Sequence, residues 1–178
     1  MKKPYLILII LFALGVFVRL GAHPANFAPI GAIALFAGVY LPKKWAIILP
    51  VITMLVGDIF LGFYDLRLTA VVYGCFILTG LVGLMISKHK NAFTVLTAVL
   101  GSSLFFFLAT NFAVWAFSPW YPHNAGGLML CYGLAVPFFR NSLFGDLFFS
   151  GLLFGAYELA ELRFFNALWY NKGEEIKL

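Results

Sequence analysis

Residues 88–117 read KHKNAFTVLTAVLGSSLFFFLATNFAVWAF, and this segment indicates the class of fold most clearly. It begins with two lysines and a histidine, and the run from Ala92 to Phe117 that follows contains no charged side chain. A helix needs about 20 apolar residues to cross the hydrocarbon core of a bilayer. The run therefore predicts a transmembrane helix. The lysines predict that its first end faces the cytoplasm, because basic residues accumulate in cytoplasmic loops.

The remaining lysines repeat this arrangement along the chain. Every lysine lies in one of four clusters, which long apolar stretches separate: Lys2–Lys3, Lys43–Lys44, Lys88–Lys90 and the tail from Lys172. This spacing is typical of a polytopic membrane protein that crosses the bilayer in pairs of helices, with each cluster on the cytoplasmic side. We expect an all-α protein with six transmembrane helices and both termini cytoplasmic, the spans being about residues 4–20, 27–41, 45–63, 68–87, 92–117 and 141–162.

One apolar segment between the last two spans is too short to cross the membrane. Gly127–Phe139 has a pair of glycines on one side and Pro137 near the other. Counting it as a span gives seven helices and an outside tail, whereas Arg163 and the tail lysines favour a tail inside. We therefore expect a half-helix at about residues 127–139, in or under the outer surface. Where a helix is broken at membrane depth, its unpaired backbone groups must be satisfied by protein or by water in a cavity. The break near residues 127–139 and the short second span therefore predict one shared cavity near the outer surface.

Composition supports one integral membrane domain over residues 1–178. The chain is 63% hydrophobic and 11% charged, whereas about a quarter of the residues of a soluble domain are charged. The net charge of +5 comes from the lysine clusters rather than from a basic stripe, so nucleic acid is not an expected partner. Two cysteines make no disulfide framework. Arg19 interrupts the first apolar run, and further spans follow it, which favours a retained first helix over a cleaved signal peptide.

Two aspartates lie within apolar runs and would fall in the outer half of the membrane. Asp58 stands in VGDIFLG and Asp146 in FGDLFFSG, a short internal echo. Ionisable residues inside a membrane usually pair with one another or line a pathway. Two interpretations stay open and are compatible: the aspartates accept hydrogen bonds from a polar ligand, or they pair with Arg19 or Arg140 and hold helices together. Around Asp146, serines at four-residue spacing predict a polar stripe that faces inward.

Other side chains near the expected outer face have two interpretations each. Arg140 and Asn141 are suited to two-point binding of a carboxylate or phosphate, or else Arg140 reaches for lipid headgroups. Asn111, which shares a helix face with Trp115, either binds a ligand or makes an interhelical hydrogen bond. The aromatic loop that contains Trp120 is either a lid over a cavity or an interfacial anchor.

The two cysteines are interpreted in the same way. Cys75 is either a small hydrophobic side chain or, beside Tyr73, a ligand of a soft metal centre within a bound molecule. A disulfide between Cys75 and Cys131 depends on distances that the sequence does not give.

Five runs carry a resemblance to a known group of proteins. They are HPANFAPIGA (23–32), GDIFLGF (57–63), VYGCF (72–76), TNFAVW (110–115) and PFFRNSLFGD (137–146). These runs resemble an uncharacterised family of small bacterial membrane proteins, which is in turn distantly similar to the substrate-binding S components of energy-coupling-factor (ECF) vitamin transporters. The resemblance implies a six-helix bundle in the bacterial inner membrane, with a binding site in the outer half that the loops after helices 1, 3 and 5 close.

The chain departs from S components at one position. Components that dock on a shared energising ATPase module carry an alanine-xxx-alanine face on helix 1, whereas Ala13 is followed here by Phe17. The resemblance therefore implies an energising module as a partner, but the sequence of helix 1 lacks the face through which such a module docks. Solitary S-component-like proteins handle cobalamin, some through a cysteine on the cobalt, and Cys75 makes cobalamin a candidate substrate.

These observations favour a substrate-binding membrane protein for the uptake of a small vitamin- or cofactor-like molecule. One alternative is a non-transporting scaffold or accessory subunit, and another is a membrane enzyme acting on lipid or a quinone. No catalytic motif is present, so we expect no enzyme activity, no bound metal and no cofactor. The residues that we expect to contact the substrate are Asn26, Asp58, Tyr73, Cys75, Asn111, Trp115, Arg140, Asn141 and Asp146. We expect Trp120 to stack on the substrate or to cover it.

Overall fold

The computed structural model describes the backbone of residues 3–22 and 24–175, and the side chains of residues 6–22 and 24–163. Over these residues the chain forms six α-helices and one 3₁₀ turn, without a strand. The prediction of an all-α fold is therefore confirmed. The elements are α1 (Lys3–Leu20), α2 (Ile30–Tyr40), α3 (Trp45–Leu61), α4 (Leu66–Ile86), η1 (Ser87–His89), α5 (Ala92–Phe117) and α6 (Ala125–Glu175).

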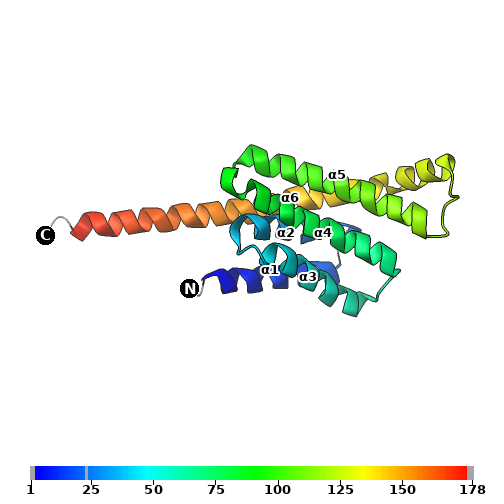
Figure 1. Cartoon of the computed structure of the whole chain (residues 1–178). Coiled ribbons are helices and arrows are strands. Elements are labelled where there is room, and N and C mark those ends of the chain that lie inside the picture. The colour runs from blue at the N-terminus through cyan, green and yellow to red at the C-terminus, as the bar shows by residue number, and fades with distance from the viewer. Residues whose placement is uncertain (1–2, 23, 176–178) are drawn as a thin grey trace.

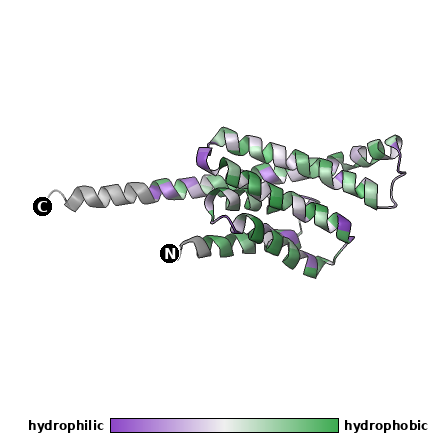
Figure 2. Ribbon diagram, in the orientation of Figure 1, coloured by the Kyte–Doolittle hydropathy of each residue, from purple (hydrophilic) through white to green (hydrophobic). Residues whose placement is uncertain are grey.

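Three segments are long and apolar enough to cross a membrane: Leu66–His89, Ala92–Phe117 and Ala125–Arg163. The other three helices are apolar but shorter, and α2 has only 11 residues. Many large hydrophobic side chains lie exposed on the surface of the bundle, including Phe17, Phe60 and Leu104. Figure 2 shows that hydrophilic residues gather mostly at the ends of the helices. Such a surface is suited to a lipid environment, since soluble proteins rarely expose contiguous apolar patches of this extent.

The predicted half-helix is wrong. Ala125–Glu175 is a single α-helix of 51 residues that passes through Pro137 without a break, so the boundary expected before Asn141 does not exist. Proline removes one backbone hydrogen bond and crowds the preceding turn. In surroundings where no water replaces lost backbone hydrogen bonds, a helix that keeps its other hydrogen bonds has a lower free energy than one with an open turn. Proline is therefore tolerated inside such a helix.

The short α2 forms the centre of the bundle and packs against α3, α4 and α6. Eight of its residues are buried, in a run of alanine, isoleucine, leucine, phenylalanine and glycine. Its closest approach is to α4, where a Cβ atom on Gly38 would overlap the backbone of Gly80 and Gly83. Glycine at these positions brings the two helix backbones together, as small residues do in membrane helix pairs.

The two ends of the bundle differ in composition. Figure 1 places the start of α1, the turn at Lys43–Lys44, η1 with its neighbour Lys90, and the far end of α6 at one end, which we call the lysine end. Residues 24–29 and the connections 62–65 and 118–124 lie at the opposite end, which we call the loop end.

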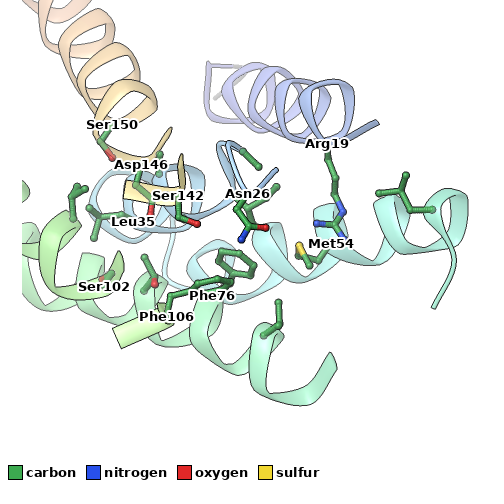
Figure 3. Close-up of a pocket in the computed structure, with 18 of the residues that line it drawn as sticks. Arg19, Asn26, Leu35, Met54, Phe76, Ser102, Phe106, Ser142, Asp146 and Ser150 are labelled. Carbon is green, nitrogen blue, oxygen red and sulfur yellow. The ribbon is translucent and has the colours of Figure 1, made fainter. Parts of the chain in front are cut away.

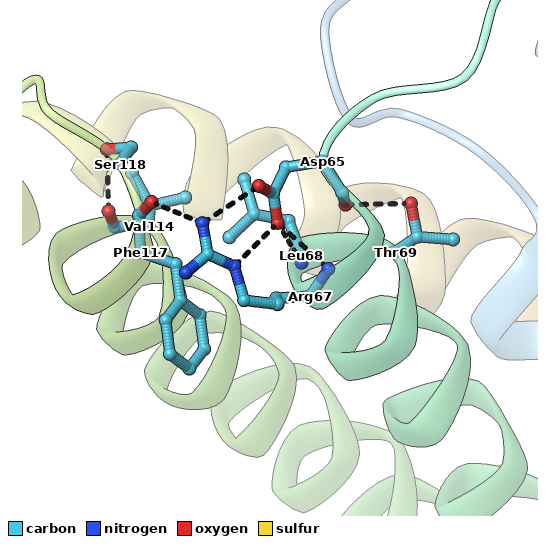
Figure 4. Close-up of polar contacts among 7 residues, drawn as sticks. All are labelled: Asp65, Arg67, Leu68, Thr69, Val114, Phe117 and Ser118. Carbon is cyan, nitrogen blue, oxygen red and sulfur yellow. Dashed lines mark hydrogen bonds and ion pairs between the residues drawn. The ribbon is translucent and has the colours of Figure 1, made fainter.

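At the loop end, Asp65 and Arg67 join the start of α4 to the end of α5 (Figure 4). Asp65 caps α4 by accepting hydrogen bonds from the backbone N–H groups of Arg67 and Leu68. The Arg67 guanidinium donates to Asp65 Oδ2 at 3.0 Å and to the Phe117 carbonyl oxygen at 3.3 Å. The guanidinium and the two backbone donors hold the pKa of the Asp65 carboxyl below its ordinary value.

Candidate functional site

A cavity of about 320 Å³ lies inside the half of the bundle nearer the loop end, and all six helices contribute to its wall (Figure 3). We call it the loop-end cavity. Most of its wall is apolar, with Leu35, Phe76 and Phe106 among the larger side chains. Polar groups enter at a few points, and these are Arg19, Asn26, Tyr64, Thr79, Ser102, Ser142, Asp146 and Ser150. An apolar wall with few polar groups is typical of small-molecule sites.

The polar stripe that the sequence predicts on α6 faces this cavity. Ser142, Asp146 and Ser150 all line it, each one helical turn beyond the last, and Figure 3 shows them on one face of the helix. Asp146 Oδ2 accepts a hydrogen bond from Ser103 Oγ at 2.6 Å. The prediction that these side chains point inward is confirmed.

The second oxygen of Asp146 lies beside the first turn of α2. A Cβ atom on Gly31 would overlap Asp146 Oδ1, so glycine leaves the space that the carboxylate fills. The N-terminal turn of a helix stabilises a nearby anion by up to about 2 kcal/mol in buried geometries. Oδ1 makes no hydrogen bond, and the carboxylate no ion pair, with any side chain that the structure describes. Asp146 therefore presents an oxygen that can accept a hydrogen bond from a guest molecule.

Asp58 has different surroundings. Arg19, in the last turn of α1, forms an ion pair with Asp58 Oδ1 on α3, and Tyr73 of α4 donates its hydroxyl to Oδ2 at 2.7 Å. The carboxylate is only 1% exposed. Gly57 leaves room for the Arg19 side chain to lie across α3. Arg19, Asp58 and Tyr73 thus join three helices, and of these residues Arg19 borders the cavity.

Asn26 reaches the cavity from the connection between α1 and α2. Its backbone has φ 65°, in the left-handed region that asparagine tolerates better than most residues. Asn141, on α6, donates from its side-chain amide to the Ala25 carbonyl oxygen at 3.0 Å and so fixes the neighbouring peptide. Asn26 therefore lines the cavity directly, whereas Asn141 acts on it through this connection. His23 lies outside the described residues.

The other predicted residues lie away from the cavity. Arg140 is exposed and makes no hydrogen bond or ion pair with the described part of the chain. Asn111 donates to the Phe107 carbonyl oxygen in its own helix, at 2.8 Å. Trp115 donates from its indole N–H to the Pro122 carbonyl oxygen at 3.0 Å, and Trp120 is 70% exposed.

Both cysteines are buried free thiols, so no disulfide joins them. Cys131 contacts the Asn111 carbonyl oxygen, and Cys75 is not among the residues that line the cavity. Within the described residues, no group of three or more histidine, cysteine, aspartate or glutamate side chains is placed to hold a metal ion.

Sequence reasoning missed the contribution of α5. Ser102 lines the cavity and Ser103 holds Asp146, both near the middle of the long apolar helix. The signal was present as GSSL, residues 101–104, a polar pair with the apolar or small residues 98–101 on one side and 104–109 on the other. Neighbouring residues on a helix point about 100° apart, so only the packing reveals which of two serines faces a cavity and which a helix.

The fold and this cavity define a hydrophobic bundle of six α-helices around a small, partly polar internal site. Residues 1–168 match the family described as "Family of unknown function (DUF6580)", and the chain belongs to that family. The prediction of an uncharacterised family is thereby confirmed. No curated protein and no solved structure matches the chain.

Proposed function

We propose that the protein is a multi-pass protein of the bacterial inner membrane that binds a small vitamin- or cofactor-like molecule from outside and takes part in its uptake. In this proposal the bundle is of the ECF S-component type, with six spans and cytoplasmic termini. The observation that carries the proposal is the loop-end cavity with the carboxylate of Asp146 at its wall. A carboxylate inside a membrane protein is costly and is typical of a binding site or pathway.

The distribution of lysines supports the proposed orientation. Two turns with lysines, at Lys43–Lys44 and at η1, lie at the end of the bundle where α1 begins. Basic loops favour the cytoplasmic side. In this orientation the loop end faces the outside, and the cavity is placed to receive a solute from there.

The charges around the cavity indicate which chemistry the molecule offers. Arg19 and Asp58 neutralise each other, whereas Asp146 has no cationic partner among the described side chains. A buried charge is stable when it is paired. We therefore propose a guest molecule that presents an amino group or a similar nitrogen donor to Asp146 and further polar atoms to Asn26.

The size of the cavity favours a small guest. About 320 Å³ is at the lower end of the range for small-molecule sites. Cobalamin is far larger than such a space, and Cys75 does not border it. The structure thus lends cobalamin no support, and we prefer a smaller molecule.

One observation favours the scaffold alternative. The contacts of Asp58 with Arg19 and Tyr73 join α1, α3 and α4 without any ligand. The two roles belong to different aspartates, so they are compatible in one protein. No observation favours an enzyme that acts on lipid or a quinone.

The proposal is tested by the small molecules that purify with the protein. The protein is isolated in mild detergent and extracted, and the extract is analysed by mass spectrometry beside that of Asp146→Asn. We expect one metabolite with a nitrogen donor to be enriched with the wild type and lost from the variant. Asp65→Asn, which changes an aspartate at the loop end outside the cavity, is the matched control and should keep the metabolite. Equal extracts from all three proteins would overturn the proposal.

A further inference from the structure

A second cavity lies in the other half of the bundle, between α5 and α6. Its volume is about 680 Å³, and its apolar wall includes Val95, Leu147 and Phe154. Tyr40, Lys90, Asn91 and Glu158 line it toward the lysine end. We call it the lysine-end cavity. The site described above does not use it.

The two cavities meet at two residues. Val99 of α5 and Ser150 of α6 line both of them, and both residues are almost fully buried. The hydroxyl oxygen of Ser150 is shielded from solvent and has no hydrogen-bond partner within the described residues. A buried hydroxyl without a partner destabilises the fold, so its presence between two cavities needs an explanation. A polar solute or a water molecule that passes this point would supply the missing hydrogen bond.

The lysine-end cavity is open to the surface along α6, where Gly151 and Gly155 are exposed, and polar side chains line its mouth. A Cβ atom on Gly151 or Gly155 would meet no atom within 4 Å, so this part of α6 leaves open space. At the mouth, Lys90 Nζ donates to Glu158 Oε1 at 3.0 Å, and Tyr40 donates its hydroxyl to the same oxygen. Lys90 Nζ also lies 4.0 Å from the centre of the Tyr40 ring. Such a cluster can open by side-chain rotation, because it joins three flexible side chains near the surface.

We propose that the two cavities are the two halves of one solute pathway between α5 and α6, with Val99 and Ser150 as the partition between them. The pathway rests on the proposed function, since it carries the same molecule from the site at Asp146 toward the cytoplasmic side. Movement of two side chains at the partition and of the Lys90–Glu158 pair at the mouth would connect the loop end with the lysine end. The protein would then pass a solute without rotating as a whole in the membrane.

The test measures which side of the membrane reaches the partition. Ser150→Cys places a thiol there with little change of volume, and the two native cysteines are buried, so the parent protein gives the background. The probe is a charged, membrane-impermeant methanethiosulfonate reagent, added to right-side-out or to inside-out vesicles. We expect modification of Ser150→Cys from both sides. Modification from the outside alone, or from neither side, would overturn the pathway.

A second substitution tests whether the route from the inside runs through the lysine-end cavity. Gly151→Leu adds a side chain into the open space of that cavity, and Gly133→Leu adds the same side chain to α6 where it also meets nothing within 4 Å and lines neither cavity. Combined with Ser150→Cys, Gly151→Leu should abolish labelling from the inside and leave labelling from the outside unchanged. Gly133→Leu should change neither. Equal labelling of the two double variants from the inside would contradict the pathway.

The same experiment separates a solute pathway from a lipid-filled groove. If lipid fills the lysine-end cavity, the uncharged N-ethylmaleimide will modify Ser150→Cys while the charged reagent does not from the inside, and the pathway is then wrong. The labelling needs no ligand, so its result is independent of the metabolite analysis. If a metabolite binds through Asp146 but Ser150→Cys is not labelled from the inside, the proposed function is still supported and the pathway is wrong.

Discussion

At the scale of single residues, Asp58 and Asp146 divide two roles between them. Asp58 has both carboxylate oxygens engaged, by Arg19 and Tyr73, and is closed to a guest. Asp146 has one hydrogen bond, to Ser103, and an oxygen beside a cavity. The same residue type in a similar sequence context thus serves helix packing in one place and a candidate site in the other. The difference lies in the neighbours that the fold brings to each carboxylate.

Removing the charge of Asp58 should destabilise the protein more than removing that of Asp146. Asp58→Asn removes the carboxylate that pairs with the partly buried guanidinium of Arg19, and breaking a buried pair from one side costs about 3–5 kcal/mol. Asp146→Asn removes a charge that has no cationic partner, and the amide oxygen still accepts from Ser103. Thermal unfolding in detergent measures both, and a larger loss of Tm in Asp146→Asn would contradict this division of roles.

The Asp65 cap should give a measurable dependence on pH. Its pKa is lowered in the folded state by Arg67 and two backbone donors, so its stabilising contribution is present above the pKa of an unfolded aspartate, about 3.9, and is lost as the pH falls through the folded value. Asparagine caps helices as well as aspartate does but carries no charge. We expect Asp65→Asn to have the lower Tm at pH 7, and the two proteins to converge as the pH falls through the lowered pKa of folded Asp65. A Tm difference that does not change with pH throughout acid titration would contradict this assignment.

At the level of the helices, the sequence predicted where each helix lies along the chain better than it predicted which residues of other helices it contacts. A long apolar run is a local signal, and lysine clusters mark its ends, so α4 and α5 were predicted to within two residues. Whether Asp146 meets Ser103 depends on the rotation of α6 against α5, which no local pattern encodes. The prediction of a break at Pro137 is wrong for a related reason. A proline breaks a helix only where water or other protein groups can hydrogen-bond the freed backbone groups, and this depends on the surroundings.

The continuity of α6 makes a prediction for Pro137. Proline in a helix interior costs up to about 3 kcal/mol relative to alanine. Pro137→Ala restores the backbone hydrogen bond to the Gly133 carbonyl oxygen, so we expect a higher Tm and an unchanged amount of bound metabolite. If the substitution lowers the Tm, the chain uses Pro137 as a hinge, and the continuous helix is wrong.

The close approach of α2 and α4 makes a prediction for Gly38. Gly38→Ala places a Cβ atom against the backbone of Gly80 and Gly83, and overpacking of this kind costs about 1–3 kcal/mol. Gly74→Ala, in α4, meets no atom within 4 Å and is the matched control. We expect a lower Tm for the first variant and an equal or higher Tm for the second, because alanine favours a helix over glycine. Equal Tm values for both would show that the two backbones are not in contact.

For the whole molecule, uptake from outside requires one orientation of the bundle in the membrane. Lysine turns mark one end of the bundle and the cavity lies toward the other. In that orientation Lys44→Cys should react with an impermeant thiol reagent from the inside, and Trp120→Cys, in the exposed loop after α5, from the outside. Reaction of both from the same side would contradict the orientation.

We propose above all that the cavity at Asp146 holds one small molecule. Native mass spectrometry of the wild-type protein, released gently from detergent micelles, can detect such a molecule. We expect a population heavier than the bare chain by the mass of one small molecule, at one copy per chain, which collisional activation removes. The bare mass alone, from protein that is folded by its Tm, would contradict it.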